Sequence, residues 1–157
     1  MKNSDQEKAK AVNNEFNALS GLQFLRHQMA LGENSPMGTL MNISVIAVED
    51  GMVKLQAVPE AKFYNPMLRI HGGFAATLID SALGSAVLSK LGVGVGVGTV
   101  ALNVNYVRKI DVSTGAIVAT ANVLHAGRTM LTAEAKVHDS AGVLYAHGTG
   151  TFLVYPK

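Results

Sequence analysis

Residues 71–91 read HGGFAATLIDSALGSAVLSKL, and this stretch decides the fold. It is apolar on nearly every helical face, and Asp80 is the only charged side chain between His71 and Lys90. A helix that is apolar all round is buried in the interior of a protein, whereas a surface helix keeps one polar face. The stretch therefore predicts a long central helix over residues 71–91, enclosed by the rest of the chain.

The segments on both sides of this helix have the patterns of antiparallel strands. Residues 40–49 and 52–58 predict two strands, joined at Asp50-Gly51, which is a strong hairpin signal. Residues 129–138 alternate apolar and polar side chains, as a strand with one buried face does. The predicted strands after the helix are 99–109, 116–125, 129–138 and 143–155. The order predicts an α+β fold in which one curved antiparallel sheet wraps around the helix.

The other segments connect or flank this unit. Residues 4–31 predict a helix with a possible break at Gly21, followed by a loop over 32–36. This helix either caps a pocket or covers the sheet. Residues 92–98 alternate Gly and Val, which predicts a flexible loop or a weak start of a strand. We expect a single domain overall, with an N-terminal helical segment over 1–34 and the main domain over 35–157.

Composition excludes several classes of function. Net charge is +2, far from the basic surface that nucleic-acid binding needs. The chain has no cysteine, which excludes a disulfide, a thiolate nucleophile and a sulfur-ligated zinc site. Its five histidines lack the spacing of metal ligands, so we expect no cofactor or metal. A polar N-terminus and the absence of a run of roughly 20 apolar residues predict a cytoplasmic protein that does not bind membranes. Charged residues are only 15% of the 157, which suggests that one face is buried against another copy.

Asp80 does not fit the pattern of a purely structural helix. Aspartate is a poor residue for a helix interior, and a buried carboxylate without a partner costs several kcal/mol. At about 100° per residue, Gly73, Thr77, Asp80 and Gly84 lie on one stripe of the helix, so small groups beside the carboxylate leave room for a ligand. The alternative is a structural aspartate paired with an arginine or a backbone donor. Perturbed carboxylates cluster at active sites, which favours the functional interpretation.

The start of the same helix is a second candidate feature. His71-Gly72-Gly73 places glycines where the first N–H groups have no acceptor within the helix, and such groups polarise a carbonyl oxygen. A tight turn would equally explain the glycines. Gly72 and Asp80 are separated by about 12 Å along one helix, too far to serve one carbonyl. Two helices antiparallel about a twofold axis would bring Asp80 of one chain near Gly72 of the other, which predicts a homodimer with composite sites.

These residues carry a family resemblance. Asn65 is followed by His71-Gly72-Gly73, and the block H-G-G-x(4)-L-x-D-x-A-x-G is matched through Gly84. The strand at 103–106, followed by Arg108, and the turn at 127–129 extend the similarity over about residues 35–155. The chain resembles the hotdog-fold acyl-CoA thioesterases of the PaaI-like group, which includes phenylacetate-degradation and hydroxybenzoyl-CoA thioesterases.

The resemblance implies catalytic roles for five residues. The Gly72 N–H would polarise the thioester carbonyl, and Asn65 would help to hold that carbonyl or the attacking water. Asp80 from the opposing subunit would be the general base or the nucleophile. Thr99 would orient the water and the carboxylate, and His71 would brace the loop and Asn65, although a helix-start hydrogen bond explains His71 equally well.

The resemblance also implies an acyl-CoA substrate and a homo-oligomer, either a dimer or a tetramer built from two dimers. The residues expected to bind the substrate and its coenzyme A phosphates are Gly73, Arg108, Gly127 and Arg128. Solvated charges at strand ends are the alternative for the two arginines. Two other functions stay open: a hotdog hydratase or dehydratase, which would pair a histidine such as His71 with the carboxylate, and a non-catalytic acyl-CoA-binding module.

Overall fold

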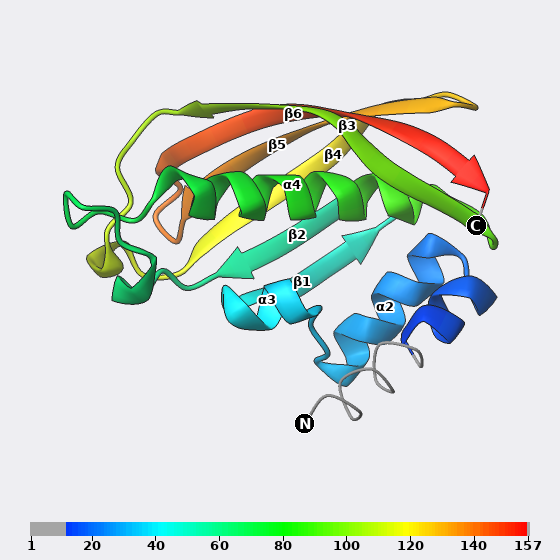
Figure 1. The fold of residues 1–157 in the computed structure, drawn as a ribbon, viewed down its shortest axis with the longest axis horizontal. Coiled ribbons are helices and arrows are strands. Elements are labelled where there is room, and N and C mark those ends of the chain that lie inside the picture. The colour runs from blue at the N-terminus through cyan, green and yellow to red at the C-terminus, as the bar shows by residue number, and fades with distance from the viewer. Residues whose placement is uncertain (1–11, 157) are drawn as a thin grey trace.

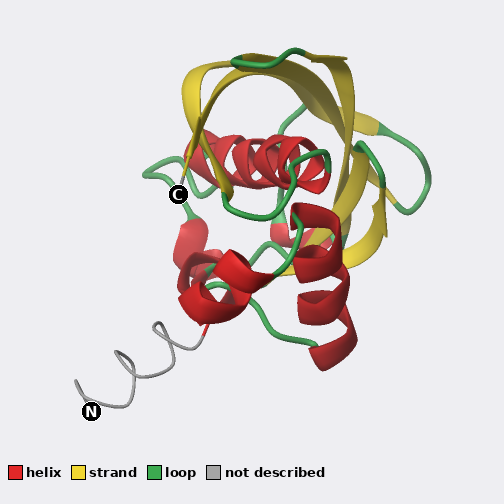
Figure 2. Ribbon diagram, turned by 90° about the vertical axis from the view of Figure 1, so that its right-hand side faces the viewer, coloured by secondary structure: helices red, strands yellow, loops and turns green. Residues whose placement is uncertain are grey.

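Helix α4 (Gly72–Ser89) lies against the inner side of a six-stranded antiparallel sheet with the strand order β1-β2-β4-β5-β6-β3 (Figure 1). The computed structural model describes residues 12–156. Viewed from the side, the sheet curves around α4, and the N-terminal helices lie below it (Figure 2). The predicted α+β hotdog fold is therefore confirmed. The strands are β1 (Ile43–Glu49), β2 (Met52–Ala57), β3 (Val95–Tyr106), β4 (Ile117–Ala126), β5 (Met130–Asp139) and β6 (Leu144–Pro156).

Helix α4 is the core of the fold, as its sequence predicts. Phe74 is 2% exposed, and Leu78 and Leu83 are fully buried. Burial of each such side chain contributes about 1.5–3 kcal/mol. Among the described residues, α4 is the one helix with the length and hydropathy of a membrane span, and half of it is buried inside the structure, as is typical of a core helix.

Short side chains on the inner face of the sheet let α4 approach closely. Ala121 of β4 pairs with Ala135 of β5, and Ala119 and Ala133 occupy neighbouring inward positions on the same strands. All four are at most 1% exposed. Because alanine extends only to Cβ, the larger side chains of α4 fill the space between the layers.

The predicted hairpin between β1 and β2 is confirmed, and it is tied to the end of α4. Gly51 adopts a φ of 81°, a conformation that favours glycine. Its N–H donates to Ser89 Oγ at 2.8 Å, and Lys90 Nζ forms an ion pair with Asp50 Oδ2 at 2.7 Å. The C-terminal end of α4 is thereby fixed to the β1–β2 turn.

The predicted helix over 4–31 is two helical pieces in its described part, 12–18 and α2 (Gly21–Leu31); residues 4–11 lie outside the described residues. The break falls at Ser20, whose side chain accepts from the N–H of Gln23 while the Gln23 side chain accepts from the N–H of Ser20. This capping box starts a new helix. Leu25 and Gln28 of α2 are buried, and the helix packs against β1 and α4, so it covers one edge of the sheet.

The prediction for 32–49 was wrong at one point. A short helix, α3 (Pro36–Leu40), stands where a loop and the start of a strand were expected, so β1 begins only at Ile43. The Ser35 side chain accepts from the N–H of Gly38 at 3.0 Å, and Pro36 occupies the first turn. A serine cap followed by proline favours a helix start over a loop.

Of the two alternatives for the Gly-Val run over 92–98, the structure shows the start of a strand, so β3 begins before the predicted residue 99. The strand starts at Val95 and pairs with β6 along its length. The Tyr155 ring of β6 lies over Gly96, and its hydroxyl donates to Val97 O at 3.2 Å. An aromatic side chain thus covers glycines that would otherwise weaken an edge strand. The two short 3₁₀ turns are η1 (Ala61–Phe63) and η2 (Val112–Thr114).

Candidate active site

The first turn of α4 presents one free amide. His71 caps the helix, and its Nδ1 accepts from the N–H of Gly73 at 2.8 Å. Because Nδ1 is the acceptor, the neutral imidazole carries its proton on Nε2. The N–H of Gly72, at the start of the helix, has no acceptor among residues 12–156. This amide is therefore available to a ligand oxygen.

Asn65 shapes the loop that leads into α4. Its Oδ1 accepts from the N–H of Met67 at 2.9 Å and from that of Arg69 at 3.2 Å. This arrangement closes a turn in which Leu68 has a φ of 55°. The two N–H bonds of the Asn65 amide group have no acceptor in the described part of the chain, and they stay free to donate.

His71 is not linked to Asn65 by a hydrogen bond in the structure. Its side chain binds the Gly73 amide, and its backbone N–H donates to Phe63 O at 2.8 Å. His71 therefore fixes the helix start directly and joins the loop through the main chain.

Asp80 pairs with Thr99 on the side of α4 that the sheet leaves open. The Thr99 hydroxyl donates to Asp80 Oδ1 at 3.1 Å. The sheet directs Thr99 toward the helix because it pairs with Phe152, which is 1% exposed, just before a bulge in β3. This contact brings together two of the predicted catalytic residues, 19 positions apart in sequence.

The stripe predicted along α4 is on its uncovered face. Gly73, Thr77, Asp80 and Gly84 are all half-buried, whereas residues on the opposite face are fully buried. The Asp80 carboxylate is therefore open to solvent in the single chain and is not enclosed by apolar groups as the sequence suggested. A partner that covers this face would exclude that solvent.

The candidate residues form two clusters within one chain. Asn65, His71, Gly72 and Gly73 lie at the beginning of α4, while Asp80 and Thr99 lie about two turns further along it. No hydrogen bond joins the two clusters within residues 12–156. A single chain thus presents two separate groups on its uncovered side, a free amide at Gly72 and the carboxylate of Asp80.

Comparison with known proteins assigns the family. The thioesterase superfamily matches residues 69–146. VNG_1336C of Halobacterium salinarum, provisionally named an esterase, is 35% identical over 128 residues, which cover 74% of this chain and 83% of that protein. The chain belongs to the thioesterase superfamily. Family chemistry is the hydrolysis of thioesters, so the protein is a hydrolase of this class.

Solved structures agree with the fold of this thioesterase. The conserved protein PA5202 from Pseudomonas aeruginosa is 31% identical, covers 83% of this chain and 98% of its own, and superposes with a TM-score of 0.72. PaaI from the Escherichia coli phenylacetic acid degradation operon is 21% identical, covers 85% of this chain and 92% of its own, and has a TM-score of 0.74, which shows a shared fold. The thioesterase is therefore PaaI-like in architecture.

The predicted coenzyme A-binding residues of the thioesterase lie at opposite ends of α4. Arg108 follows β3 near the beginning of the helix, and its backbone N–H donates to Tyr145 O at 3.0 Å. Gly127 and Arg128 form the turn between β4 and β5, on the side where the β1–β2 hairpin meets the end of α4. Both arginines are exposed. Within one chain, the structure does not bring them together.

Sequence reasoning missed a charged cluster beside the start of α4. Asp111 Oδ1 lies 3.5 Å from Arg69 Nη1, and its Oδ2 lies 3.6 Å from Lys109 Nζ. The ion pair of Arg69 and Asp111 cannot be predicted from a sequence motif, because the two residues are far apart in the sequence and only the folded chain brings them into contact. Tyr106 was also missed: it packs on Gly72, although its strand was part of the family resemblance.

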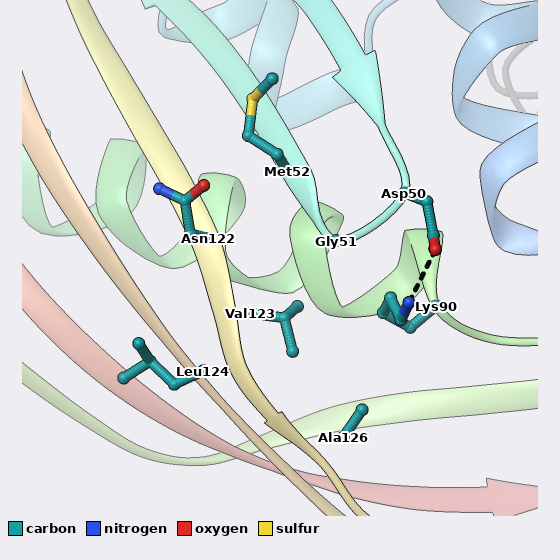
Figure 3. A pocket seen from close by; sticks show the side chains of 8 residues that line it. All are labelled: Asp50, Gly51, Met52, Lys90, Asn122, Val123, Leu124 and Ala126. Atoms are coloured by element: carbon teal, nitrogen blue, oxygen red, sulfur yellow. Dashed lines mark hydrogen bonds and ion pairs between the residues drawn. The ribbon is translucent and has the colours of Figure 1, made fainter.

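A cavity of about 390 Å³ lies at the other end of α4, between the β1–β2 turn and β4 (Figure 3). Asp50, Lys90, Asn122 and Leu124 are among its lining residues, and the Lys90–Asp50 ion pair lies at its side. None of the five candidate catalytic residues lines it. Among residues 12–156, no group of three or more His, Asp or Glu side chains is placed to hold a metal ion.

Proposed function

We propose that this protein hydrolyses acyl-CoA thioesters to a free acid and coenzyme A. The observation that carries the proposal is the Asp80–Thr99 hydrogen bond on the open face of a helix whose first amide, at Gly72, is free. Hydrolysis of a thioester needs an activated water and a donor for the developing oxyanion. The chain offers one group for each task.

The reaction proceeds through a tetrahedral intermediate. Asp80, held by Thr99, takes a proton from a water molecule while the water oxygen attacks the carbonyl carbon of the thioester. The carbonyl oxygen becomes an oxyanion and accepts from the N–H of Gly72, and the Asn65 amide donates to that oxygen or positions the water. The C–S bond then breaks, and the proton held by Asp80 passes to the departing thiolate. In an alternative course, Asp80 attacks the carbonyl carbon as a nucleophile and the C–S bond breaks, so that coenzyme A leaves as the thiolate. Water then cleaves the mixed anhydride into the free acid and the Asp80 carboxylate, and the proton released passes to the thiolate.

A homodimer would assemble complete sites. Gly72 and Asp80 of one chain are about 12 Å apart along α4, so a single carbonyl cannot reach both. Two α4 helices, antiparallel about a twofold axis, place Asp80 of one protomer opposite Gly72 of its partner. This arrangement gives two equal sites per dimer.

The two edges of the sheet support such a dimer. The β1 edge is covered by α2, whereas β3, twelve residues long, is an open edge. Val100, the bulged residue of β3, is 61% exposed, and Val107 just beyond the strand is 51% exposed. Long apolar edge strands are normally paired or protected in soluble assemblies. We propose that β3 pairs with the same strand of a second copy, and that two such dimers form the tetramer expected from the family resemblance.

Basic side chains would bind the coenzyme A phosphates. Arg108 is exposed near the start of α4, and Arg128 is exposed at the opposite end. Antiparallel helices bring these opposite ends together across the dimer, so the two arginines of different protomers would flank one site. Gly73 and Gly127 stay proposed substrate contacts, and at both positions the chain itself fills the place of a Cβ, with His71 Nδ1 at 2.9 Å and Met130 O at 2.8 Å. We propose that the reaction needs no metal or cofactor, which retained activity after chelation with EDTA would support. We also propose that the protein is cytoplasmic, which cell fractionation tests.

The position of His71 disfavours the hydratase alternative. Such an enzyme needs an imidazole beside the carboxylate, but here Nδ1 accepts from the Gly73 amide at 2.8 Å and fixes the ring at the helix start. Water addition to enoyl-CoA without thiol release would support the hydratase instead.

Release of free thiol from short, medium, long and aromatic acyl-CoA thioesters tests the proposal directly. The wild-type protein should release thiol from at least one class, and Asp80→Asn should abolish this while still binding the substrate. A wild-type protein that binds acyl-CoA but neither hydrolyses it nor hydrates enoyl-CoA would be an acyl-CoA-binding module. Full turnover by Asp80→Asn would show that Asp80 is not the base.

A further inference from the structure

We propose that Tyr106 is a catalytic residue, whose hydroxyl donates a second hydrogen bond to the thioester carbonyl oxygen beside the Gly72 amide. The inference rests on the proposed hydrolysis and deepens it, because it assigns the second donor of the oxyanion to Tyr106. Of the two roles proposed for the Asn65 amide, it thereby selects the positioning of the water. It arises from the way β3 ends against the start of α4.

The register of the sheet directs Tyr106 toward the helix. Tyr106 is the last residue of β3 and pairs with Ala146 of β6, which is 1% exposed and faces the core. Residues paired across antiparallel strands share a face of the sheet. The Tyr106 side chain therefore extends over the inner side, where α4 begins.

The phenol of Tyr106 packs directly against Gly72. A Cβ atom at position 72 would lie 3.2 Å from Tyr106 Cζ and 3.4 Å from its Oη. Such contacts are tighter than those of most real Cβ atoms, so the absence of a side chain at Gly72 allows the phenol to lie where it does. The hydroxyl end of the ring, not only its apolar edge, is the part beside the helix start.

The Tyr106 hydroxyl is also free to donate. Tyr145 donates to Asp139 Oδ2 at 3.1 Å and Tyr155 donates to Val97 O at 3.2 Å, so both hydroxyls are engaged. The Tyr106 hydroxyl forms no hydrogen bond within residues 12–156, and the residue is 57% exposed. The chain thus leaves two donors side by side, the Gly72 N–H and the Tyr106 O–H.

Two donors match the needs of a thioester. A carbonyl oxygen has two lone pairs, and one that accepts from the Gly72 N–H at about 2.9 Å has a second lone pair to offer. As the oxygen gains negative charge, both hydrogen bonds strengthen. Because the bonds are stronger in the transition state than with bound substrate, Tyr106 should act on kcat more than on KM.

Tyr106→Phe tests the proposal, because it keeps the ring on Gly72 and removes only the hydroxyl. Loss of one oxyanion donor lowers kcat by about 10²-fold or more, and we expect about 100-fold with KM changed by less than about threefold. The matched control is Tyr155→Phe. Tyr155 is a half-exposed residue of β6 whose hydroxyl donates to Val97 O of β3, away from the start of α4. The kcat of this variant should stay within about twofold of the wild type. Thermal unfolding of both variants checks that they are folded.

The outcomes separate this inference from the proposed function. If the wild type hydrolyses thioesters and Asp80→Asn abolishes the activity, but Tyr106→Phe retains kcat within about threefold, the second donor is wrong and the hydrolase stands. Equal losses in the two tyrosine variants would also overturn the inference, because they would show a general effect on the strand. A wild type that hydrolyses no thioester would overturn both.

Discussion

Thr99→Val is a sensitive probe of the proposed base, because it removes the hydroxyl that donates to Asp80 Oδ1 at 3.1 Å and keeps the size and branching of the side chain. A hydrogen bond to a charged group contributes about 1.5–3 kcal/mol. Thr99 is exposed and Asp80 is half-buried in the single chain, so the lower value of about 1.5 kcal/mol applies. If this bond orients the carboxylate in the transition state, kcat should fall about tenfold.

The assay is thiol release at saturating acyl-CoA, with two comparison variants. Thr99→Ser keeps the hydroxyl and should retain kcat within about threefold. Thr149→Val alters an exposed threonine on β6, which pairs with Asn103 on the outer face of the sheet, and it should leave kcat unchanged. Wild-type turnover in Thr99→Val, or an equal loss in Thr99→Ser, would refute the assigned role of the hydroxyl.

Two further predictions concern stability. A Cβ at Gly21 would lie 1.8 Å from Leu88 O, so Gly21→Ala must displace α2 from α4. This variant should lower the free energy of unfolding by about 1–3 kcal/mol. The control is Gly92→Ala, whose added Cβ has no atom within 4 Å beyond its chain neighbours, and it should change the free energy of unfolding by less than about 1 kcal/mol. Equal urea midpoints for the two variants would contradict this. The backbone N–H of Val143 is the main cause that lowers the pKa of Asp139, so the stabilisation is complete above the unfolded value of about 3.9 and is lost as pH falls through the folded value. Asp139→Asn should therefore destabilise the protein at pH 7, and the loss should shrink as the pH falls through the lowered folded-state pKa of Asp139. A loss of stability that stays the same at every pH would show that the charge is not responsible.

The central helix and the hairpins were predictable from sequence because their signals are local. The apolar run of α4 and the Asp50-Gly51 turn depend on neighbouring residues only. The helix α3 was missed, although Ser35 before Pro36 is a recognisable helix start. For the Gly-Val run, the sequence left a loop and a weak start of a strand open, and the structure shows the strand from Val95 onward. Local sequence did not decide between the two, since glycines weaken a strand and the distant Tyr155 covers them.

The sequence named candidate residues for the site, whereas most of their contacts depend on the fold. The pairing of Asp80 with Thr99 followed from the family resemblance, and the structure provides the contact. The contact of Tyr106 with Gly72 depends on the register of β3 with β6 and on where α4 begins, which no sequence spacing encodes. The exposure of Asp80 in one chain likewise follows from the open face of the helix.

Co-expression of two inactive variants tests most directly whether Asp80 and Gly72 of different chains form one site. Gly72→Pro removes the amide donor at the first helical position, and His71 has the extended φ of −60° and ψ of 138° that suits a residue before proline. The proline Cβ also crowds the Tyr106 ring of the same chain, so the variant inactivates the whole carbonyl-binding half of the site, which is the half that the test requires. Asp80→Asn removes the base. If the two variants pair at random, half of all dimers are heterodimers, and each heterodimer has one intact site of two. The mixture should therefore recover about a quarter of wild-type thiol release. Mixed dimers that form but stay inactive would show that the two residues do not act across the interface.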